Sequence, residues 1–378
     1  MKFKYLSITS IFFIAISYWF TFSDASSKSG FTITGEIANM PDSTLLMLKN
    51  LSEDEYIDSV IVMDGKFVFS GQLKNTPEEL RISTHPREWQ TVPFYYLDLF
   101  MGNENVSIYT DKSVLPQVVQ TKGSKINHER TQYLNESNQM RHELTLLTEK
   151  WAKAKEDTKA LLKEQRNAFI DSMDQWRVNY TLDNFNTYSS LLTYLYYSND
   201  FQLEEVRLRY KALDKELKNS KYGQTIAVQL KYPKPEKGDT YYDFEAFNTE
   251  LQKTRLSDIE SPYILLHFGA KGCYGSHLAT DDMKNIQDQY KGEIAFVSYF
   301  VNPEQERWLD HIKEKEIDWL TLWQEGDKYA EPYNKYHING TPTFYIIDTQ
   351  TKKVVDTWFG FSKGQLEEKL NKIKLLDE

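Results

Sequence analysis

The spacing of apolar and polar residues marks the first part of the chain as β structure. Residues 31–37 alternate between apolar and polar side chains, the pattern of a strand with one buried face. Two further strand-like runs, residues 59–63 and 66–70, flank Asp64-Gly65, a dipeptide typical of tight hairpin turns. Short strands separated by turn residues predict an antiparallel β domain, a small sandwich or barrel, over residues 26–124.

The next stretch, residues 125–232, has a helical period. Apolar residues recur three and four positions apart, as at Leu144 and Leu147, and long segments contain neither glycine nor proline. The many charges over residues 149–166 fit the solvated face of an ordinary helix pair, which we favour, or a coiled-coil surface for a partner. We therefore expect a helical region that ends at Pro233, where a stiff linker begins.

From residue 233 to residue 378 the chain alternates strands with amphipathic helices. Continuous apolar runs without alternation are typical of strands that are covered on both faces. The predicted strands are residues 263–268, 293–300, 343–348 and 353–358, and the predicted helices are residues 283–290, 304–315 and 362–374. This order predicts an α/β domain over residues 233–378 that ends with a hairpin and a helix.

The N-terminus has the composition of an export signal. Lys2 and Lys4 precede an apolar run over residues 6–22, and small residues follow the run up to Ala25. We expect residues 1–25 to be a signal peptide that is cleaved after Ala25, which predicts a location in the periplasm or cell envelope. Because the run is close to the length that spans a bilayer, membrane anchoring through residues 6–22 is the alternative, and a core helix is a third.

Composition narrows the possible functions. The 378-residue chain has a formal net charge of −10 and no domain-wide excess of Lys and Arg, so no nucleic acid is expected as a partner. Cys273 is the single cysteine of the chain, which rules out an intramolecular disulfide framework, a Cys-rich zinc site and an iron–sulfur cluster. The sequence predicts no cofactor and no metal.

Cys273 lies where a predicted strand meets a helix, a position that favours the thiolate. Neighbouring glycines, among them Gly272 and Gly275, indicate exposed turn backbone. At a helix N-terminus, unpaired N–H groups and the helix dipole stabilise a negative sulfur. Ser276 lies one turn further on, with a hydroxyl able to donate to that sulfur, and His267 on the strand is a possible proton relay. The alternatives are an inert buried cysteine and a core histidine.

Two motifs make the C-terminal domain similar to a known family. The segment Phe268-Gly-Ala-Lys-Gly-Cys-Tyr-Gly-Ser and the later Gly340-Thr-Pro-Thr resemble the active-site and cis-proline loops of the thioredoxin fold, and in particular its extracytoplasmic TlpA/ResA-like branch. The resemblance implies that Cys273 is the nucleophile and that Pro342 is a cis-proline. It also implies that Thr341 and Pro342 contact the substrate.

The rest of the chain extends this resemblance. The segments Thr34-Gly-Glu-Ile, Asp64-Gly-Lys-Phe-Val-Phe-Ser-Gly and Lys122-Gly-Ser are similar to a β domain of unknown function that precedes such thioredoxin domains in envelope proteins of some Gram-negative bacteria. The resemblance therefore implies a C-terminal thioredoxin fold behind a small all-β domain and a helical spacer. His267 falls where the family usually has a buried aspartate.

Departures from the family pattern define the predicted mechanism. Gly272 replaces the tryptophan before the nucleophile, and Ser276 replaces the second, resolving cysteine. Without a second cysteine, a Cys-x-x-Ser site can carry out only one-thiol exchange. In this reaction the thiolate attacks a disulfide, forms a mixed disulfide and is released by an external thiol. The expected partners are disulfide- or thiol-bearing envelope proteins and an external thiol or redox partner.

Two other functions are consistent with the sequence. A catalytically retired thioredoxin fold would serve as a binding or chaperone-like module of the cell envelope, and the missing second cysteine favours this alternative. In a structural envelope component, the β domain would be responsible for recognition. Retention of Cys273, the only cysteine, at the nucleophile position favours exchange over the retired module.

Overall fold

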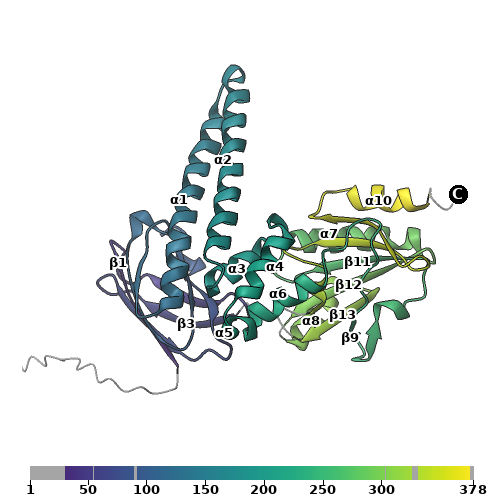
Figure 1. The fold of residues 1–378 in the computed structure, drawn as a ribbon, viewed down its shortest axis with the longest axis horizontal. Helices are drawn as coiled ribbons and strands as arrows, with labels where there is room; N and C mark the ends of the chain where they lie inside the picture. The colour runs from purple at the N-terminus through teal and green to yellow at the C-terminus, as the bar shows by residue number, and fades with distance from the viewer. Residues whose placement is uncertain (1–29, 54, 89–91, 303, 326–330, 375–378) are drawn as a thin grey trace, which may run out of the picture.

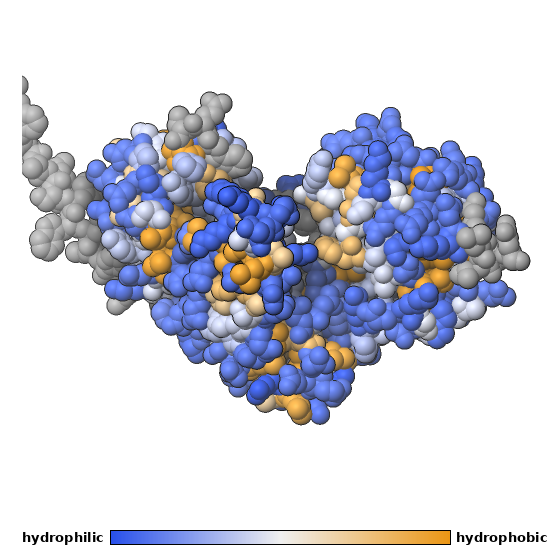
Figure 2. All heavy atoms as spheres, turned by 90° about the horizontal axis from the view of Figure 1, so that it is seen from above, coloured by the Kyte–Doolittle hydropathy of each residue, from blue (hydrophilic) through white to orange (hydrophobic). Residues whose placement is uncertain are grey.

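The protein has three parts that follow one another along the chain (Figure 1). The computed structural model describes residues 30–53, 55–88, 92–302, 304–325 and 331–374. The predicted signal segment, with its alternative as a membrane anchor, lies outside the described residues. Among the residues described, no helix is both long and apolar enough to span a bilayer. Seen from above, a notch separates the β domain on the left from the C-terminal domain on the right (Figure 2).

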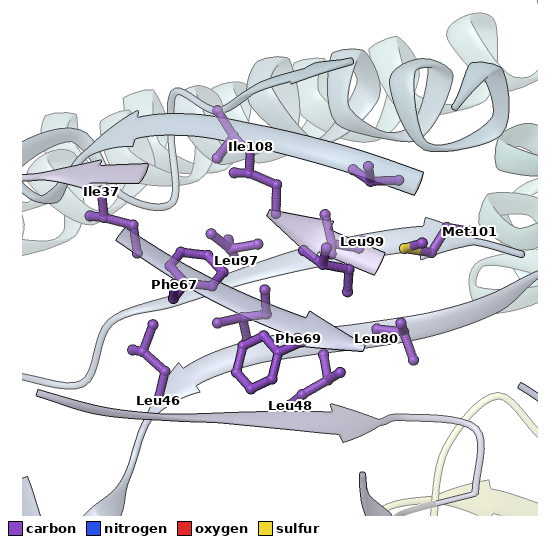
Figure 3. Packing of buried hydrophobic residues seen from close by; sticks show 14 of the residues in the cluster. Ile37, Leu46, Leu48, Phe67, Phe69, Leu80, Leu97, Leu99, Met101 and Ile108 are labelled. Carbon is purple, nitrogen blue, oxygen red and sulfur yellow. The ribbon is translucent and has the colours of Figure 1, made fainter. Parts of the chain in front are cut away.

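The first part is a sandwich of two four-stranded sheets. Its strands are β1 (Phe31–Ala38), β2 (Leu45–Asn50), β3 (Glu55–Ile61), β4 (Lys66–Gly71), β5 (Glu78–Thr84), β6 (Tyr96–Met101), β7 (Asn105–Asp111) and β8 (Gln120–Lys122). One sheet has the order β4-β1-β7-β8 and the other β3-β2-β5-β6. Apolar side chains from both sheets fill the space between them, including Phe67, Phe69, Leu48 and Leu99 (Figure 3).

Strand direction differs from the expectation at one pair. β1 and β7 run parallel, with Ile33 opposite Val106, so the sandwich is not purely antiparallel. The chain passes through the other sheet between these strands, so no tight turn forces them to be antiparallel. The expected hairpin is also only partly present. Asp64 and Gly65 have positive φ angles, as a type I′ turn requires, but β3 and β4 leave this turn into different sheets.

The second part is helical, as predicted. It contains α1 (Lys125–Lys153), α2 (Glu156–Asp183), α3 (Tyr188–Tyr196), α4 (Leu203–Ala212), α5 (Lys215–Asn219) and α6 (Lys221–Lys231). Ser124 caps α1 by accepting a hydrogen bond from the Asn127 N–H group. α1 and α2 form a long hairpin that projects from the molecule (Figure 1). Side chains over residues 149–166, near its tip, are mostly exposed to solvent.

Two buried glutamates of β5 attach the sandwich to the helices. Glu79 is 5% exposed and pairs with Arg130 of α1 at 3.3 Å. The adjacent Glu78 is 1% exposed and pairs with Lys221 of α6 at 2.7 Å. Glu79 also accepts a hydrogen bond from the Tyr196 hydroxyl of α3. Because each carboxylate has a charged partner on a different helix, the β domain is held against the helical part at several points.

The third part is a seven-stranded mixed sheet with helices on both faces. Its elements are β9 (Glu245–Phe247), β10 (Lys253–Arg255), β11 (Tyr263–Gly269), α7 (Tyr274–Ile286), β12 (Ile294–Asn302), α8 (Gln305–Lys315), β13 (Leu320–Glu325), α9 (Glu331–Lys335), β14 (Thr343–Asp348), β15 (Lys353–Phe359) and α10 (Gln365–Lys374). The strand order is β10-β9-β13-β12-β11-β14-β15, with β11, β12 and β13 parallel. Phe296 packs with α7 and α10, whereas the next residue, Val297, packs with α9.

The structure corrects two details of the predicted domain. The helix expected over residues 283–290 begins at Tyr274, directly after the cysteine, and its last turn is a 3-10 helix up to Tyr290. β13 and the short strands β9 and β10 were not predicted from their sequences. β9 and β10 have three residues each, too few to show a periodic pattern.

Candidate active site

Cys273 is the N-cap residue of α7, immediately after β11 and its turn. Its backbone N–H donates to the Ala270 carbonyl at 3.1 Å, and its own carbonyl accepts from the N–H of His277 at 3.1 Å. The residue is partly exposed, whereas the following Tyr274 is 76% exposed. The sulfur therefore lies at the solvent-facing start of a helix, where the helix dipole favours negative charge.

The loop between α9 and β14 lies against the thiol. The Thr341–Pro342 bond is cis, as predicted, and the Cys273 Sγ atom donates to the Thr341 carbonyl oxygen at 3.0 Å. Gly275 makes close approach of this loop possible, because a Cβ atom at this position would lie 3.2 Å from Cδ of Pro342. The structure thus brings Cys273, Thr341 and Pro342 together.

The surroundings of Cys273 favour the thiolate. Partial burial raises the pKa of the thiol, but hydrogen bonds from the Thr341 hydroxyl, the N–H groups of Ser276 and Gly275, and the Ser276 hydroxyl outweigh it. The net effect is a lower pKa than that of an ordinary cysteine. A thiol that donates to a carbonyl is stabilised in its neutral form, so the contact with Thr341 O works in the opposite direction.

Ser276 lies beneath the loop and ties it to the helix. The side chain is 2% exposed, and Oγ accepts a hydrogen bond from the Ala270 N–H at 3.3 Å. His277 adds a second tie, since its Nε2–H donates to the Lys271 carbonyl at 2.6 Å. These contacts fix the backbone on both sides of Cys273. The serine thus lies within hydrogen-bond reach of the Cys273 sulfur, and its part in catalysis stays a prediction.

His267 is buried in the domain core under the loop. Its Nδ1 atom lies 3.0 Å from Ser298 Oγ, which also accepts a hydrogen bond from Trp319 Nε1–H at 2.9 Å. The ring stacks on Phe344, and burial lowers the pKa of His267 to about 3. With this pKa the histidine is uncharged at neutral pH. No hydrogen bond joins His267 to Cys273 among the residues that the structure describes, so its role as a proton relay remains a prediction.

A neighbouring histidine has similar chemistry. His311 of α8 is 3% exposed and lies at an aromatic contact distance of 5.4 Å from the His277 ring. Burial, with repulsion from His277 and nearby lysines, lowers the pKa of His311 to about 4. Within the described ranges no three His, Cys, Asp or Glu side chains are arranged to hold a metal ion.

Sequence reasoning missed the groups that surround the loop from farther along the chain. The Tyr333 hydroxyl donates to the Gly269 carbonyl at 2.8 Å, which holds the end of β11. Gln229 of α6 donates from Nε2 to Asn334 Oδ1 at 3.3 Å, joining the helical part to α9. Neither contact has a sequence signal, since each pairs residues that are far apart in the chain, and α9, which carries Tyr333 and Asn334, was not predicted.

A cysteine at the junction of a central strand and a helix, facing a cis-proline loop, defines a thioredoxin-type site. Comparison with known families agrees with this geometry. Residues 261–354 match the family model described as thioredoxin-like, and residues 31–129 match the model of a domain of unknown function, DUF4369. The chain thus combines a C-terminal thioredoxin-like domain with an N-terminal DUF4369 domain, as the resemblance implied.

Solved structures similar to the chain match about a third of its length. A thiol-disulfide oxidoreductase from Bacteroides fragilis is 21% identical, with 36% of this chain and 99% of that chain covered and a TM-score of 0.33. The thioredoxin domain of a thiol-disulfide oxidoreductase from Bacteroides vulgatus is 19% identical, with coverages of 36% and 96% and a TM-score of 0.32. StoA from Bacillus subtilis is 18% identical, with coverages of 34% and 95% and a TM-score of 0.29. The search of curated proteins found no match.

Proposed function

We propose that the protein is a thiol-disulfide oxidoreductase that works with one cysteine. The observation that carries the proposal is the position of Cys273, at the start of α7 and 3.0 Å from the carbonyl of the residue that precedes a cis-proline. A lowered thiol pKa gives a larger fraction of thiolate at neutral pH, and the thiolate is the form that attacks disulfides.

The proposed reaction has three exchange steps. The Cys273 thiolate attacks one sulfur of a substrate disulfide, and the other substrate sulfur leaves as a thiolate that takes a proton from water. An external thiolate then attacks the Cys273 sulfur, releases the substrate thiol and remains attached to Cys273. A second external thiol removes the first as a disulfide. In total two electrons pass from two external thiols to the substrate disulfide. His267 is not required for any of these steps.

Thr341 and Pro342 are proposed to hold the substrate. Proline has no N–H group, and the backbone beside it lies next to the thiol. An extended substrate segment would pair with this backbone, an arrangement in which main-chain hydrogen bonds supply affinity without requiring one sequence. The substrate cysteine would then face Sγ of Cys273.

The proposed place of action is the periplasm or cell envelope. The basic residues and apolar run at the N-terminus support export, with cleavage after Ala25 or retention of residues 6–22 as an anchor. Disulfides persist in such oxidising compartments, so envelope proteins with disulfides or thiols are the proposed partners, together with an external thiol or redox partner.

A retired binding module is the second candidate. The observation that favours it is Ser276, which occupies the position of a resolving cysteine and whose oxygen accepts the Ala270 N–H as a structural contact. In such a module the thiol would have ordinary reactivity and substrates would bind without exchange.

Mixed-disulfide formation separates the two candidates. The full chain without residues 1–25 is incubated at pH 7 with an excess of glutathione disulfide, and the intact mass is followed with time. Exchange predicts a single glutathione adduct, its removal by reduced glutathione, and no adduct in Cys273→Ser. The rate at which iodoacetamide alkylates Cys273 is measured beside it. If this rate is no higher than that of an unstructured cysteine peptide and no glutathione adduct forms, the exchange reaction is excluded.

A further inference from the structure

A cavity of about 250 Å³ lies between the helical part and the thioredoxin-like domain. α3 contributes Leu192 and Leu195 to its lining, and α6 contributes Gln229. On the opposite side it is lined by Ile338 and by Thr341 of the cis-proline loop. The cavity therefore needs both parts of the chain, and the thioredoxin-like domain alone would leave it without one wall.

The cavity adjoins the reactive sulfur. Two of its lining residues, Ala270 and Thr341, also contact Cys273 directly: the Ala270 carbonyl accepts its N–H, and the Thr341 carbonyl accepts its thiol. A side chain in this cavity would thus belong to a residue close in sequence to the substrate cysteine, because an extended chain advances only about 3.3 Å per residue.

One buried oxygen gives the cavity a polar preference. Gln229 is 2% exposed, and its Oε1 atom has no hydrogen-bond partner among the described residues, although its Nε2 atom donates to Asn334. A buried acceptor without a donor is unfavourable, and a ligand that supplies an N–H or O–H group there removes this cost. The rest of the lining combines apolar side chains with the polar Tyr196, Asn334 and Asn339, so an aromatic ring that carries one hydrogen-bond donor is complementary to it.

We propose that this cavity receives a tyrosine side chain of the substrate, one or two residues from its reactive cysteine, with the tyrosine hydroxyl donating to Gln229 Oε1. A cavity of about 150 Å³ is large enough for benzene, so the volume here accommodates a phenol ring. The proposal rests on exchange at Cys273 and adds the class of substrate: segments in which a tyrosine lies close to the disulfide.

The test uses the full chain without residues 1–25 and a set of symmetric peptide disulfides. Each alanine-based peptide has one cysteine, with Tyr, Phe or Ala placed one or two positions before or after it. The rate of mixed-disulfide formation is measured by mass spectrometry. We expect one Tyr position to react about 5-fold faster than the matching Phe peptide, the effect of one hydrogen bond.

Variants of the lining residues test whether the cavity causes the preference for tyrosine peptides. Gln229→Leu is expected to remove the preference for Tyr over Phe, and Ile338→Trp is expected to remove the advantage of both over Ala by filling the space. Gln224→Leu, at an exposed position of the same helix, is the matched control and should retain the preference. Equal rates with Tyr and Phe peptides, or a preference that survives in Gln229→Leu, would overturn the proposal.

Failure of the exchange reaction is detected separately. Methyl methanethiosulfonate is small enough to reach the thiol without using the cavity, so its rate reports the reactivity of Cys273 alone. Binding of a peptide with serine in place of cysteine, followed by saturation transfer from protein to tyrosine ring protons, reports the cavity alone. Saturation transfer that is present in the natural chain and absent in Ile338→Trp supports the pocket; its absence in both contradicts it.

Discussion

The thiol of Cys273 lies 3.0 Å from the carbonyl oxygen of Thr341, a residue 68 positions further along the chain. The protonated sulfur donates to this oxygen. Once the proton is lost, the Thr341 hydroxyl and the N–H groups at the start of α7 stabilise the sulfur instead. The same residue therefore contacts both protonation states, through its carbonyl in one and through its hydroxyl in the other.

Thr341→Val is expected to raise the pKa of Cys273, because it removes the hydroxyl and keeps the carbonyl. The rate of alkylation by iodoacetamide, measured from pH 5 to pH 10, should have its midpoint at a higher pH than in the natural chain. Thr351→Val, in an exposed turn, serves as the control. An unchanged midpoint in Thr341→Val would show that the hydroxyl does not stabilise the thiolate.

Ser276→Cys is expected to create a working two-cysteine site. Ser276 is 2% exposed, so a thiol there would be hidden from substrates and would react with the sulfur of Cys273. The first and fourth positions at the start of a helix are within reach of a disulfide. Insulin reduction with dithiothreitol should proceed with turnover in this variant and remain low in the natural chain and in Ser276→Ala. A variant that forms neither a disulfide nor turnover would count against a catalytic geometry.

Buried histidine should make the domain sensitive to acid. The pKa of His267 is about 3 in the folded chain because of burial, against about 6.5 for an exposed histidine. Below pH 6.5 the unfolded chain therefore binds a proton that the folded chain does not. This histidine then lowers the free energy of unfolding by about 1.4 kcal/mol per pH unit, until the pH reaches the folded pKa.

His267→Phe is the variant that measures this contribution. The ring would keep its packing against Phe344, while the titrating group is removed. Urea unfolding followed by tryptophan fluorescence at several values between pH 6.5 and pH 4.5 should give a shallower loss of stability than in the natural chain. His128→Asn, at an exposed position of α1, is the control. Equal slopes in the natural chain and His267→Phe would contradict the buried, uncharged state.

The Arg130–Glu79 pair should be important for stability. Arg130→Met removes the cation next to a carboxylate that is 5% exposed. Loss of one partner of a buried ion pair costs about 3–5 kcal/mol, so thermal unfolding should move to clearly lower temperature. Lys153→Met removes the cation of the exposed pair with Glu149 and should change stability by less than about 1 kcal/mol. Similar effects of the two substitutions would mean that the buried pair is not a main attachment of the β domain.

Export can be tested on the native protein. Mass spectrometry of the N-terminus of the chain isolated from its own cells should find Ser26 as the first residue, because the small residues that end at Ala25 form a cleavage site. Fractionation should find the protein with the envelope. A retained Met1 in the membrane fraction would instead indicate an anchor, and a retained Met1 in the cytoplasm would refute export.

Local signals in the sequence predict much of the fold and part of the site. Glycines around a cysteine after an apolar strand were enough to predict that Cys273 lies at a strand–helix turn, although the helix was expected only from residue 283. The resemblance of Gly340-Thr-Pro-Thr to a cis-proline loop was enough to predict the cis bond. Contacts between distant segments could not be predicted this way. The parallel pairing of β1 with β7 depends on how the chain passes between two sheets, and neither strand carries a local sign of it.

The cavity beside the thiol shows the same limit. Gln229 and Asn334 are 105 positions apart, and their meeting depends on how the helical part packs against the sheet. Amphipathic spacing predicts that α6 has a buried face, but it does not identify the surface that covers this face. From the sequence alone, Gln229 is therefore indistinguishable from an ordinary polar residue, and only the folded structure shows that it is buried beside a cavity.

Tyr196 contacts both the β domain and the cavity beside the cis-proline loop. Its hydroxyl donates to Glu79 of the β domain, and its side chain lines the cavity that reaches Thr341. The DUF4369 domain and the thioredoxin-like domain are therefore not interchangeable modules joined by a spacer. A relative in which another domain replaced the sandwich would have to supply an acceptor for this one hydroxyl, or the tyrosine would be free to turn away from the cavity. Exchange of the sandwich for another domain would thus disturb the cavity through Tyr196, in addition to breaking the ion pairs of Glu78 and Glu79.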